Sequence, residues 1–313
     1  MTRLGTGLAQ LLVLAAAAPL CRGLSARLRA RLQRRRGAPV WRPYAELAKL
    51  FRKEDLAPPT ASPVFLAAPR LMFLATCAAA AVLPVWHSQT LVQAPADFFL
   101  LAGALALGRL LLSLGALDGG SAFGGMGAAR EALVGTLAEG PSLLALSAVA
   151  LLSGQSSLSA MADWTLRQPW QQFSAVSMLA LASLAMVMLA ETGRMPVDNP
   201  TSHLELTMIH EAMTLEYSGP SLAWVEWASA LRLLIYLTLL VDVFFPWGLA
   251  GAGGWGAAAA AAGWFGVKIA GLLAALAVIE ASLAKLRMYA VPGYLGVATA
   301  LGALAIVLGA FGG

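Results

Sequence analysis

Residues 227–247 read WASALRLLIYLTLLVDVFFPW, and their only charged side chains are Arg232 and Asp242. A helix needs about 20 mainly apolar residues to cross a hydrocarbon core of roughly 30 Å. Because every backbone polar group inside a bilayer must be satisfied within the protein, an apolar run of this length predicts a transmembrane α-helix. The run lacks the alternating polarity of a barrel strand.

Similar runs recur along the chain of 313 residues. Hydrophobic residues make up 59% of the chain and charged residues 12%, about half the share usual in soluble domains. We therefore predict an all-α integral membrane protein, with a bundle of about eight transmembrane helices forming a single polytopic membrane domain over residues 1–313. The predicted spans are 4–21, 66–86, 97–117, 132–153, 172–190, 227–247, 263–284 and 291–311.

Positive charge is concentrated on one side of these spans. Twelve of the 21 lysines and arginines lie within residues 22–70. By the positive-inside rule that segment faces the cytoplasm, so eight crossings place both the N- and the C-terminus outside, in the periplasm. The basic cluster follows the first apolar run, which is the wrong polarity for a secretion signal, so we expect an uncleaved first helix. We expect a multi-pass protein of the bacterial cytoplasmic (inner) membrane.

Residues 22–65 form the predicted basic cytoplasmic loop, and within it 41–53 reads WRPYAELAKLFRK. This segment predicts a short amphipathic helix that lies on the membrane surface or docks a partner. The basic run is expected to contact anionic lipid of the bilayer. Aromatic residues are sparse in it, so we expect no nucleic acid partner. The predicted apolar face consists of Tyr44, Leu47, Ala48, Leu50 and Phe51.

Residues 191–219 read ETGRMPVDNPTSHLELTMIHEAMTLEYSG, a stretch too polar to span a bilayer. It belongs to the predicted acidic cytoplasmic loop, 191–226. Carboxylates that lie close together raise one another's pKa and can exchange protons. We therefore predict a proton-coupling role for the charged residues of this loop; a solvated loop helix is the alternative. The candidates are Glu191, Arg194, Asp198, Glu205, Glu211 and Glu216.

The prolines within this loop predict where helices end and begin. Pro196 and Pro200 should separate the loop from the fifth span. A new helix is expected after Pro200, and on it Glu205 and Glu216 would share one face, because eleven steps of about 100° return to nearly the same direction.

Ionisable residues also occur inside or at the ends of the predicted spans. Charge at membrane depth is costly, so such residues are functional by default, and a paired structural ion within the bundle is the alternative. Sequence alone does not show whether they line up. They are Arg109, Glu139, Asp242, Lys268 and Glu280.

Motifs for metal or nucleotide chemistry are weak or missing. Cys21 and Cys77 stand alone, so no iron–sulfur or thiolate-bound nickel site is expected in this chain. His203 and His210 lie seven residues apart, which is not the spacing of a helical metal site. The chain has no P-loop motif, so the energy to move protons should come from a partner. No catalytic residue, metal ligand or cofactor-binding residue is assigned.

Four segments resemble the membrane subunit shared by respiratory complex I, where it is called subunit 1, and the membrane-bound nickel–iron hydrogenases. They are RRRGAPVWRPYAELAKLFRKE at 34–54, ALDGGSAFGGMGAARE at 116–131, the 191–219 stretch, and EASLAKLRMYAVPGYLG at 280–296. The HLELTMIHEAM portion looks like the hydrogenase-4 and formate hydrogenlyase type. The resemblance covers nearly the whole chain in order.

This resemblance implies a role that composition and spacing do not show. It implies a noncatalytic subunit that anchors a hydrophilic redox arm to antiporter-like proton-pumping subunits and couples electron transfer to proton translocation. Hydrogenase large and small subunits would be partners, and they would carry the nickel–iron and iron–sulfur centres. The acidic loop would contact that arm, and Glu139 would be the membrane acid of the fourth helix.

Two other functions stay open. A complex I subunit with a quinone site would use the same acidic loop. A stand-alone secondary transporter usually shows paired broken helices in two related halves, and no such halves are evident here.

Overall fold

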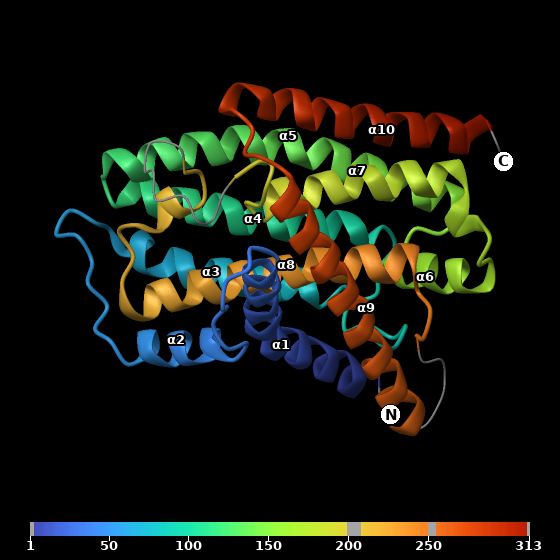
Figure 1. Ribbon diagram of the computed structural model, residues 1–313, viewed down its shortest axis with the longest axis horizontal. Coiled ribbons are helices and arrows are strands. Elements are labelled where there is room, and N and C mark those ends of the chain that lie inside the picture. Colours follow the sequence, from blue (N-terminus) through green and yellow to red (C-terminus); the bar gives the residue numbers. More distant parts are fainter. Residues whose placement is uncertain (1–2, 199–207, 250–254, 312–313) are drawn as a thin grey trace.

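The structure, a computed structural model, describes residues 3–198, 208–249 and 255–311, and within these ranges it is helical with no strand. Figure 1 labels the helices. They are α1 (Arg3–Leu32), α2 (Arg42–Phe51), α3 (Pro63–Ala80), α4 (Asp97–Asp118), α5 (Ala122–Ser153), α6 (Leu158–Arg167), α7 (Ala175–Glu191), α8 (Gly219–Phe244), α9 (Trp255–Ser282) and α10 (Val291–Phe311), with 3-10 turns at Gln171–Phe173, Glu211–Thr214 and Met288–Ala290.

The all-α multi-pass prediction is confirmed. In the described part of the chain, seven helices are long and apolar enough to cross a membrane, namely α1, α3, α4, α5, α8, α9 and α10. The remaining predicted span, 172–190, falls on the apolar helix α7, which has only 17 residues. The seven long helices and α7 occupy the eight predicted positions.

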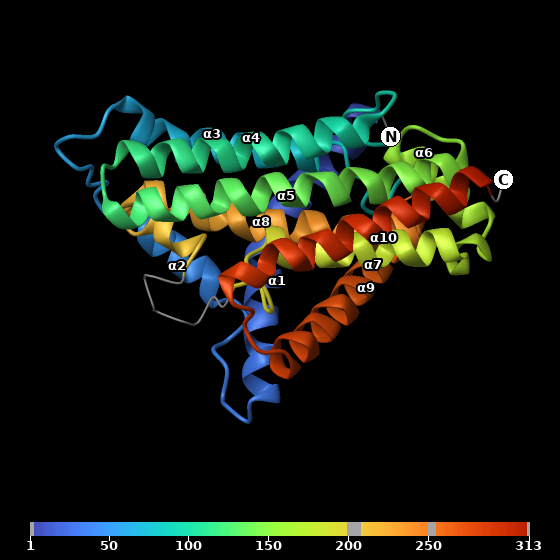
Figure 2. The same ribbon diagram turned by 90° about the horizontal axis from the view of Figure 1, so that it is seen from above.

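Helix α8 lies at the centre of the bundle. Of its most apolar window, 89% is buried, against 22% for α9 and α10. Helices α3, α4, α5, α7, α8 and α10 run along a common direction, whereas α1 and α9 cross it steeply and diverge from the bundle in Figure 2. Both views place the start of α1 and the end of α10 toward the end that holds α6.

Two helices extend beyond their predicted spans. Helix α1 continues to Leu32, so the first quarter of the predicted basic loop is helical. Helix α5 begins at Ala122, so most of the glycine-rich stretch 118–131, which lies between the predicted spans 97–117 and 132–153, forms its first turns. Ser121 caps that helix by accepting a hydrogen bond from the Gly124 N–H at 3.0 Å.

The amphipathic helix predicted at 41–53 is confirmed as α2, and its apolar face packs on this chain's own α8. Phe51 contacts Trp224 edge to face, with ring centroids 5.1 Å apart. The Tyr44 hydroxyl donates to the Ala16 carbonyl of α1 at 2.5 Å. Helix α2 is therefore docked between α1 and α8 along its inner face.

A close approach fixes the segment that precedes α8. Tyr217 stacks on Phe65 with ring centroids 4.4 Å apart, and a Cβ on Gly115 of α4 would overlap its hydroxyl oxygen. Burial raises the pKa of Tyr217, so this phenol stays neutral. Glycine at 115 is what lets the segment lie directly against α4.

Gly115→Ala should therefore destabilise the protein, because the added methyl group meets Tyr217. Overpacking of this kind costs about 1–3 kcal/mol. Gly103→Ala on the same helix is the matched control, because a Cβ there meets nothing within 4 Å. Thermal unfolding in mild detergent checks the pair: Gly115→Ala should lower the Tm by several degrees and Gly103→Ala should not. Equal Tm values would contradict this close approach.

Candidate functional site

Arg109 of α4 holds carboxylates from two other helices. It forms ion pairs with Glu191, the last residue of α7, and with Glu139 of α5. The side chains of Arg109 and Glu191 are 8% and 2% exposed, so each compensates a charge that water hardly reaches. The Glu139 side chain is 44% exposed and borders a cavity of about 330 Å³ between α4 and α5.

Gly135, one turn before Glu139, leaves room for this arrangement. A Cβ on Gly135 would lie 3.0 Å from Arg109 Nε, tighter than ordinary van der Waals contact. The small residue on α5 thus lets the guanidinium of α4 reach both carboxylates.

A second buried group lies next to this one. The Nδ1 of His210 is 3.0 Å from Glu131 Oε2 of α5, and its Nε2 is 3.1 Å from Arg232 Nη1 of α8. Arginine can only donate, so Nε2 accepts and the ring proton is on Nδ1, where it donates to Glu131. This geometry requires a neutral imidazole, since a proton on Nε2 would face the guanidinium.

The two groups adjoin each other. Arg232 is 1% exposed, and within the described residues its Nε and Nη2 atoms have no hydrogen-bond partner. A Cβ on Gly108 would lie 3.8 Å from that Nη2 atom, one residue before Arg109. Arg109 and Glu131 also line the same 330 Å³ cavity. Charged groups therefore continue from His210 to the ion pairs in the middle of the bundle.

Arg194 ties the turn after α7 to the tilted helices. Its Nη1 donates to Glu280 of α9 at 2.7 Å and to Ser25 of α1 at 2.8 Å, and Glu280 also pairs with Arg29 at 3.5 Å. The Glu280 side chain is fully buried. Burial lowers the pKa of Arg194, and the neighbouring carboxylate of Glu280 opposes that shift, so the guanidinium keeps its charge.

Asp198 fastens the same turn at a second point. It pairs with Lys285 at 2.7 Å and accepts a hydrogen bond from the Ile209 N–H at 3.2 Å. A cavity of about 130 Å³ lies beside this clamp, and both Arg194 and His210 line it. The turn after α7 and the 208–218 segment thus enclose one polar hollow.

Asp242 and Lys268 form a separate pair toward the other end of α8. Their charged atoms are 3.5 Å apart, and Lys268 donates to the Phe245 carbonyl at 3.1 Å. Asp242 is ten residues beyond Arg232, roughly 15 Å along the helix. The Asp242–Lys268 pair is therefore separate from the ion pairs of Arg109 and the contacts of His210.

The predicted site residues thus divide into sets. Arg109, Glu139 and Glu191 meet at one point, Arg194 meets Glu280, and Asp198 lies beside Arg194. Glu211 lines the hollow with them. Glu216 is half-buried with no ion pair among the described residues, and Glu205 lies outside them.

Sequence reasoning misses several partners in this site. Glu131 lies just before the predicted span 132–153, and the sequence pointed to His210 only as a possible metal ligand. Their signal is spacing: Glu131 precedes Glu139 by two helical turns, on one face of α5. The missed partners are Ser25, Arg29, Glu131, His210, Arg232 and Lys285.

Helix α7 ends at Glu191, one residue beyond the predicted end of the fifth span, because Gly193 adopts a left-handed φ of +57° that closes the helix. One expectation about the segment that follows is wrong. Between Met208 and Ser218 the backbone forms only the four-residue turn Glu211–Thr214. The helical face proposed for Glu205 and Glu216 therefore does not extend through this part.

In the described residues, no group of three or more histidine, cysteine, aspartate or glutamate side chains is placed to hold a metal ion. The charges instead pair with one another. The structure thus defines a class: a multi-pass helical membrane protein with buried ion pairs between its helices.

The chain belongs to the NADH dehydrogenase family, whose complex I subunit 1-like model matches residues 6–309. Two Escherichia coli (strain K12) relatives cover most of it. Hydrogenase-4 component C is 32% identical over 78% of this chain and 76% of its own length. Formate hydrogenlyase subunit 4 is 34% identical over 77% of both chains.

More distant proteins share the family and the fold. NADH-ubiquinone oxidoreductase chain 1 of Cyprinus carpio is 32% identical over 68% of this chain and 65% of its own length. A chain in the structure of the membrane-bound sulfane sulfur reductase, an archaeal respiratory membrane complex, has a TM-score of 0.84 at 20% identity. That match covers 97% of this chain and 98% of the other.

A double-mutant cycle tests the central pair. Arg109→Gln alone leaves Glu191 buried without its main cation, which should cost about 3–5 kcal/mol. Adding Glu191→Gln should restore part of that loss, so the two effects should not add. The exposed pair Arg42 and Glu46, with side chains 62% and 57% exposed, is the matched control, with a coupling of about 0.3–0.5 kcal/mol. Thermal unfolding in detergent measures both cycles, and additive losses at Arg109 and Glu191 would contradict a compensating pair.

Proposed function

We propose that this chain is the membrane subunit of a nickel–iron hydrogenase complex of the hydrogenase-4 or formate hydrogenlyase type. It anchors a hydrophilic redox arm to antiporter-like subunits and couples electron transfer to proton translocation across the bacterial inner membrane, with both termini in the periplasm. Two relatives more than 30% identical support the complex type, because their names place them in such systems.

One observation carries the coupling role: His210 joins the loop to the charges inside the bundle. A change in the redox arm that displaces the 208–218 segment would pull the imidazole from between Glu131 and Arg232. Both would then lose a partner in a low-dielectric setting, which raises the proton affinity of Glu131. Movement of the loop is thereby converted into proton uptake within the membrane.

The loop acids belong to the same proposal. Arg194 and Asp198 hold the turn after α7 against α9, while Glu211 lines the hollow that His210 borders. Glu205 and Glu216 are proposed on the sequence alone. Moving one proton against the membrane potential costs about 2.3 kcal/mol per 100 mV, so the redox reaction of the partner subunits must supply the energy.

Purification of the tagged chain in mild detergent, followed by mass spectrometry, tests the assembly. The expected result is co-purification of hydrogenase large and small subunits and of antiporter-like membrane subunits. Recovery of the chain alone, or with a stand-alone transport activity in liposomes, would contradict the proposal.

His210→Gln tests the coupling step. Glutamine still bonds to Glu131 or Arg232 but does not bridge them as the imidazole does. Movement of the loop would then no longer change the proton affinity of Glu131, so proton translocation per turnover should fall at least tenfold while the complex still assembles. His87→Gln, whose Nδ1 accepts only from the Gln89 N–H at 3.0 Å, is the control and should leave translocation unchanged. Complex yield and redox turnover are measured alongside, in inverted vesicles. Full translocation in the His210 variant at normal turnover would refute this role.

A complex I-type quinone site is the second candidate, favoured by the similarity to a NADH-ubiquinone oxidoreductase protein. A photoreactive quinone should then label the segment 192–218. Labelling there, with quinone-dependent turnover of the purified complex, would replace the hydrogenase assignment.

A further inference from the structure

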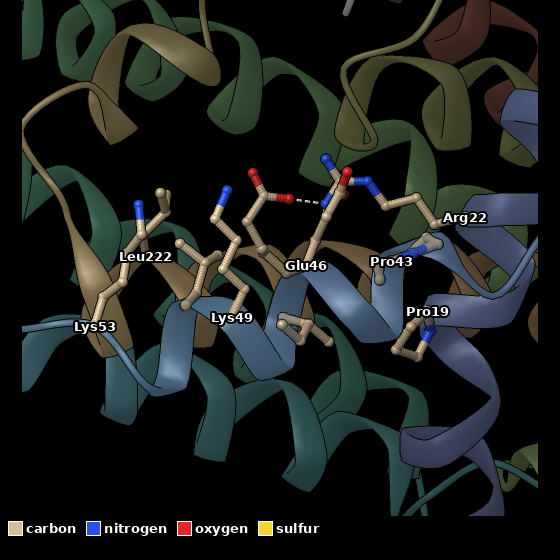
Figure 3. A pocket seen from close by; sticks show the side chains of 11 residues that line it. Pro19, Arg22, Pro43, Glu46, Lys49, Lys53 and Leu222 are labelled. Atoms are coloured by element: carbon tan, nitrogen blue, oxygen red, sulfur yellow. Dashed lines mark hydrogen bonds and ion pairs between the residues drawn. The ribbon is translucent and has the colours of Figure 1, made fainter. Parts of the chain in front are cut away.

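A lateral pocket of about 310 Å³ lies between α1, α2 and α8, away from the ion pairs of Arg109 (Figure 3). Two of its walls, α1 and α8, are helices long and apolar enough to cross the membrane. The volume is that of a small-molecule site, typically about 300–1,000 Å³. Its apolar lining consists of Pro19, Pro43, Leu47, Leu50, Leu222 and Ala230.

The charges around this pocket do not balance. Arg22 is paired with Glu226, and Glu46 with Arg42 at 2.8 Å. Lys49 in the last turn of α2 and Lys53, two residues beyond its end, make no side-chain hydrogen bond or ion pair with any residue that the structure describes. Figure 3 shows both ammonium groups extending to the same side as the Arg22 guanidinium. Two uncompensated cations therefore border an apolar hollow.

The pocket adjoins two neighbouring spaces, one beyond the end of α2 and one beside His210. A neighbouring space of about 460 Å³ shares Leu50, Lys53 and Leu222 with it, so Lys53 lies between the two. On the inner side, Arg22 and Glu226 line both this pocket and the hollow beside His210. An occupant that enters from outside thus meets the Arg22–Glu226 ion pair on the inner side.

We propose that this groove binds an anionic phospholipid, with its phosphate between Lys49 and Lys53 and an acyl chain along the leucines. The apolar walls exclude free phosphate as the fitting ligand, because most of the lining would stay unused. Lipid reaches the groove directly, since its walls are membrane helices. Trp224 and Trp227, stacked behind α2 with centroids 5.9 Å apart, are the residue type enriched where headgroups meet hydrocarbon.

Native mass spectrometry of the delipidated wild-type complex, supplied with phosphatidylglycerol or phosphatidylcholine, tests the site without any substitution. Phosphatidylglycerol should bind at least tenfold more tightly, because only it places a net negative charge between the lysines. Equal binding of both lipids would overturn the proposal.

Variants localise the binding. Lys49→Gln and Lys53→Gln should each weaken phosphatidylglycerol binding about fivefold, the effect of about 1 kcal/mol per cation near a lipid headgroup. Arg52→Gln, which lies between the two lysines in sequence but outside the pocket lining, is the matched control and should change binding less than twofold. The double variant Lys49→Arg, Lys53→Arg should keep wild-type binding. A loss as large for Arg52→Gln as for the lysines would mean diffuse surface attraction and overturn the site.

A photoreactive amino acid in place of Leu47 identifies the occupant directly. An adduct with phosphatidylglycerol is expected. An adduct with a quinone, or a cross-link to another protein subunit, would show a different occupant and refute the proposal.

Discussion

Compensation of buried charge is the constraint on which this structure depends. An arginine and a glutamate that water hardly reaches are tolerated because α4, α5 and α7 converge on Arg109. The same requirement explains the clamp at Glu280, where two arginines meet one fully buried carboxylate. Removing Arg109 or Glu280 leaves the groups paired with it without that partner, so the relative positions of these helices depend on charge as well as on apolar packing.

Much of the fold could be predicted because the length and apolar composition of a segment identify it as a transmembrane helix. Seven predicted spans correspond to long apolar helices, and the amphipathic pattern at 41–53 predicts α2 correctly. Helix boundaries were less predictable, because an apolar run marks only the part of a helix that crosses the bilayer. The polar turns by which a helix extends beyond the bilayer do not belong to that run. The glycine-rich start of α5 is an example. Because glycine has a low helix propensity, the sequence did not indicate that the helix begins at Ala122. At Gly127, however, a Cβ would lie 3.0 Å from Ala212 and Met213, so packing selects glycine within a helix.

Some residues of the buried ion pairs could be singled out from the sequence, but their pairing could not. Glu139, Arg109 and Glu280 stood out as charges in apolar runs. Which of them meet depends on helix rotation and tilt, which a single sequence does not encode in its hydropathy. His210 was hidden because its partners, Glu131 and Arg232, lie 79 and 22 residues away. Only the folded arrangement shows that the polar segment reaches down to the buried arginine.

The shortness of α7 has a consequence for the bilayer around it. Its 17 residues measure roughly 26 Å, about 4 Å less than an average hydrocarbon core. Whichever end is level with the membrane surface, the other falls short. A lone helix would meet this mismatch by thinning the lipid. Here α5 and α10 pack along α7, so protein and not lipid covers the shortfall. Polar backbone after Glu191 can therefore dip below the headgroup level without exposing itself to hydrocarbon.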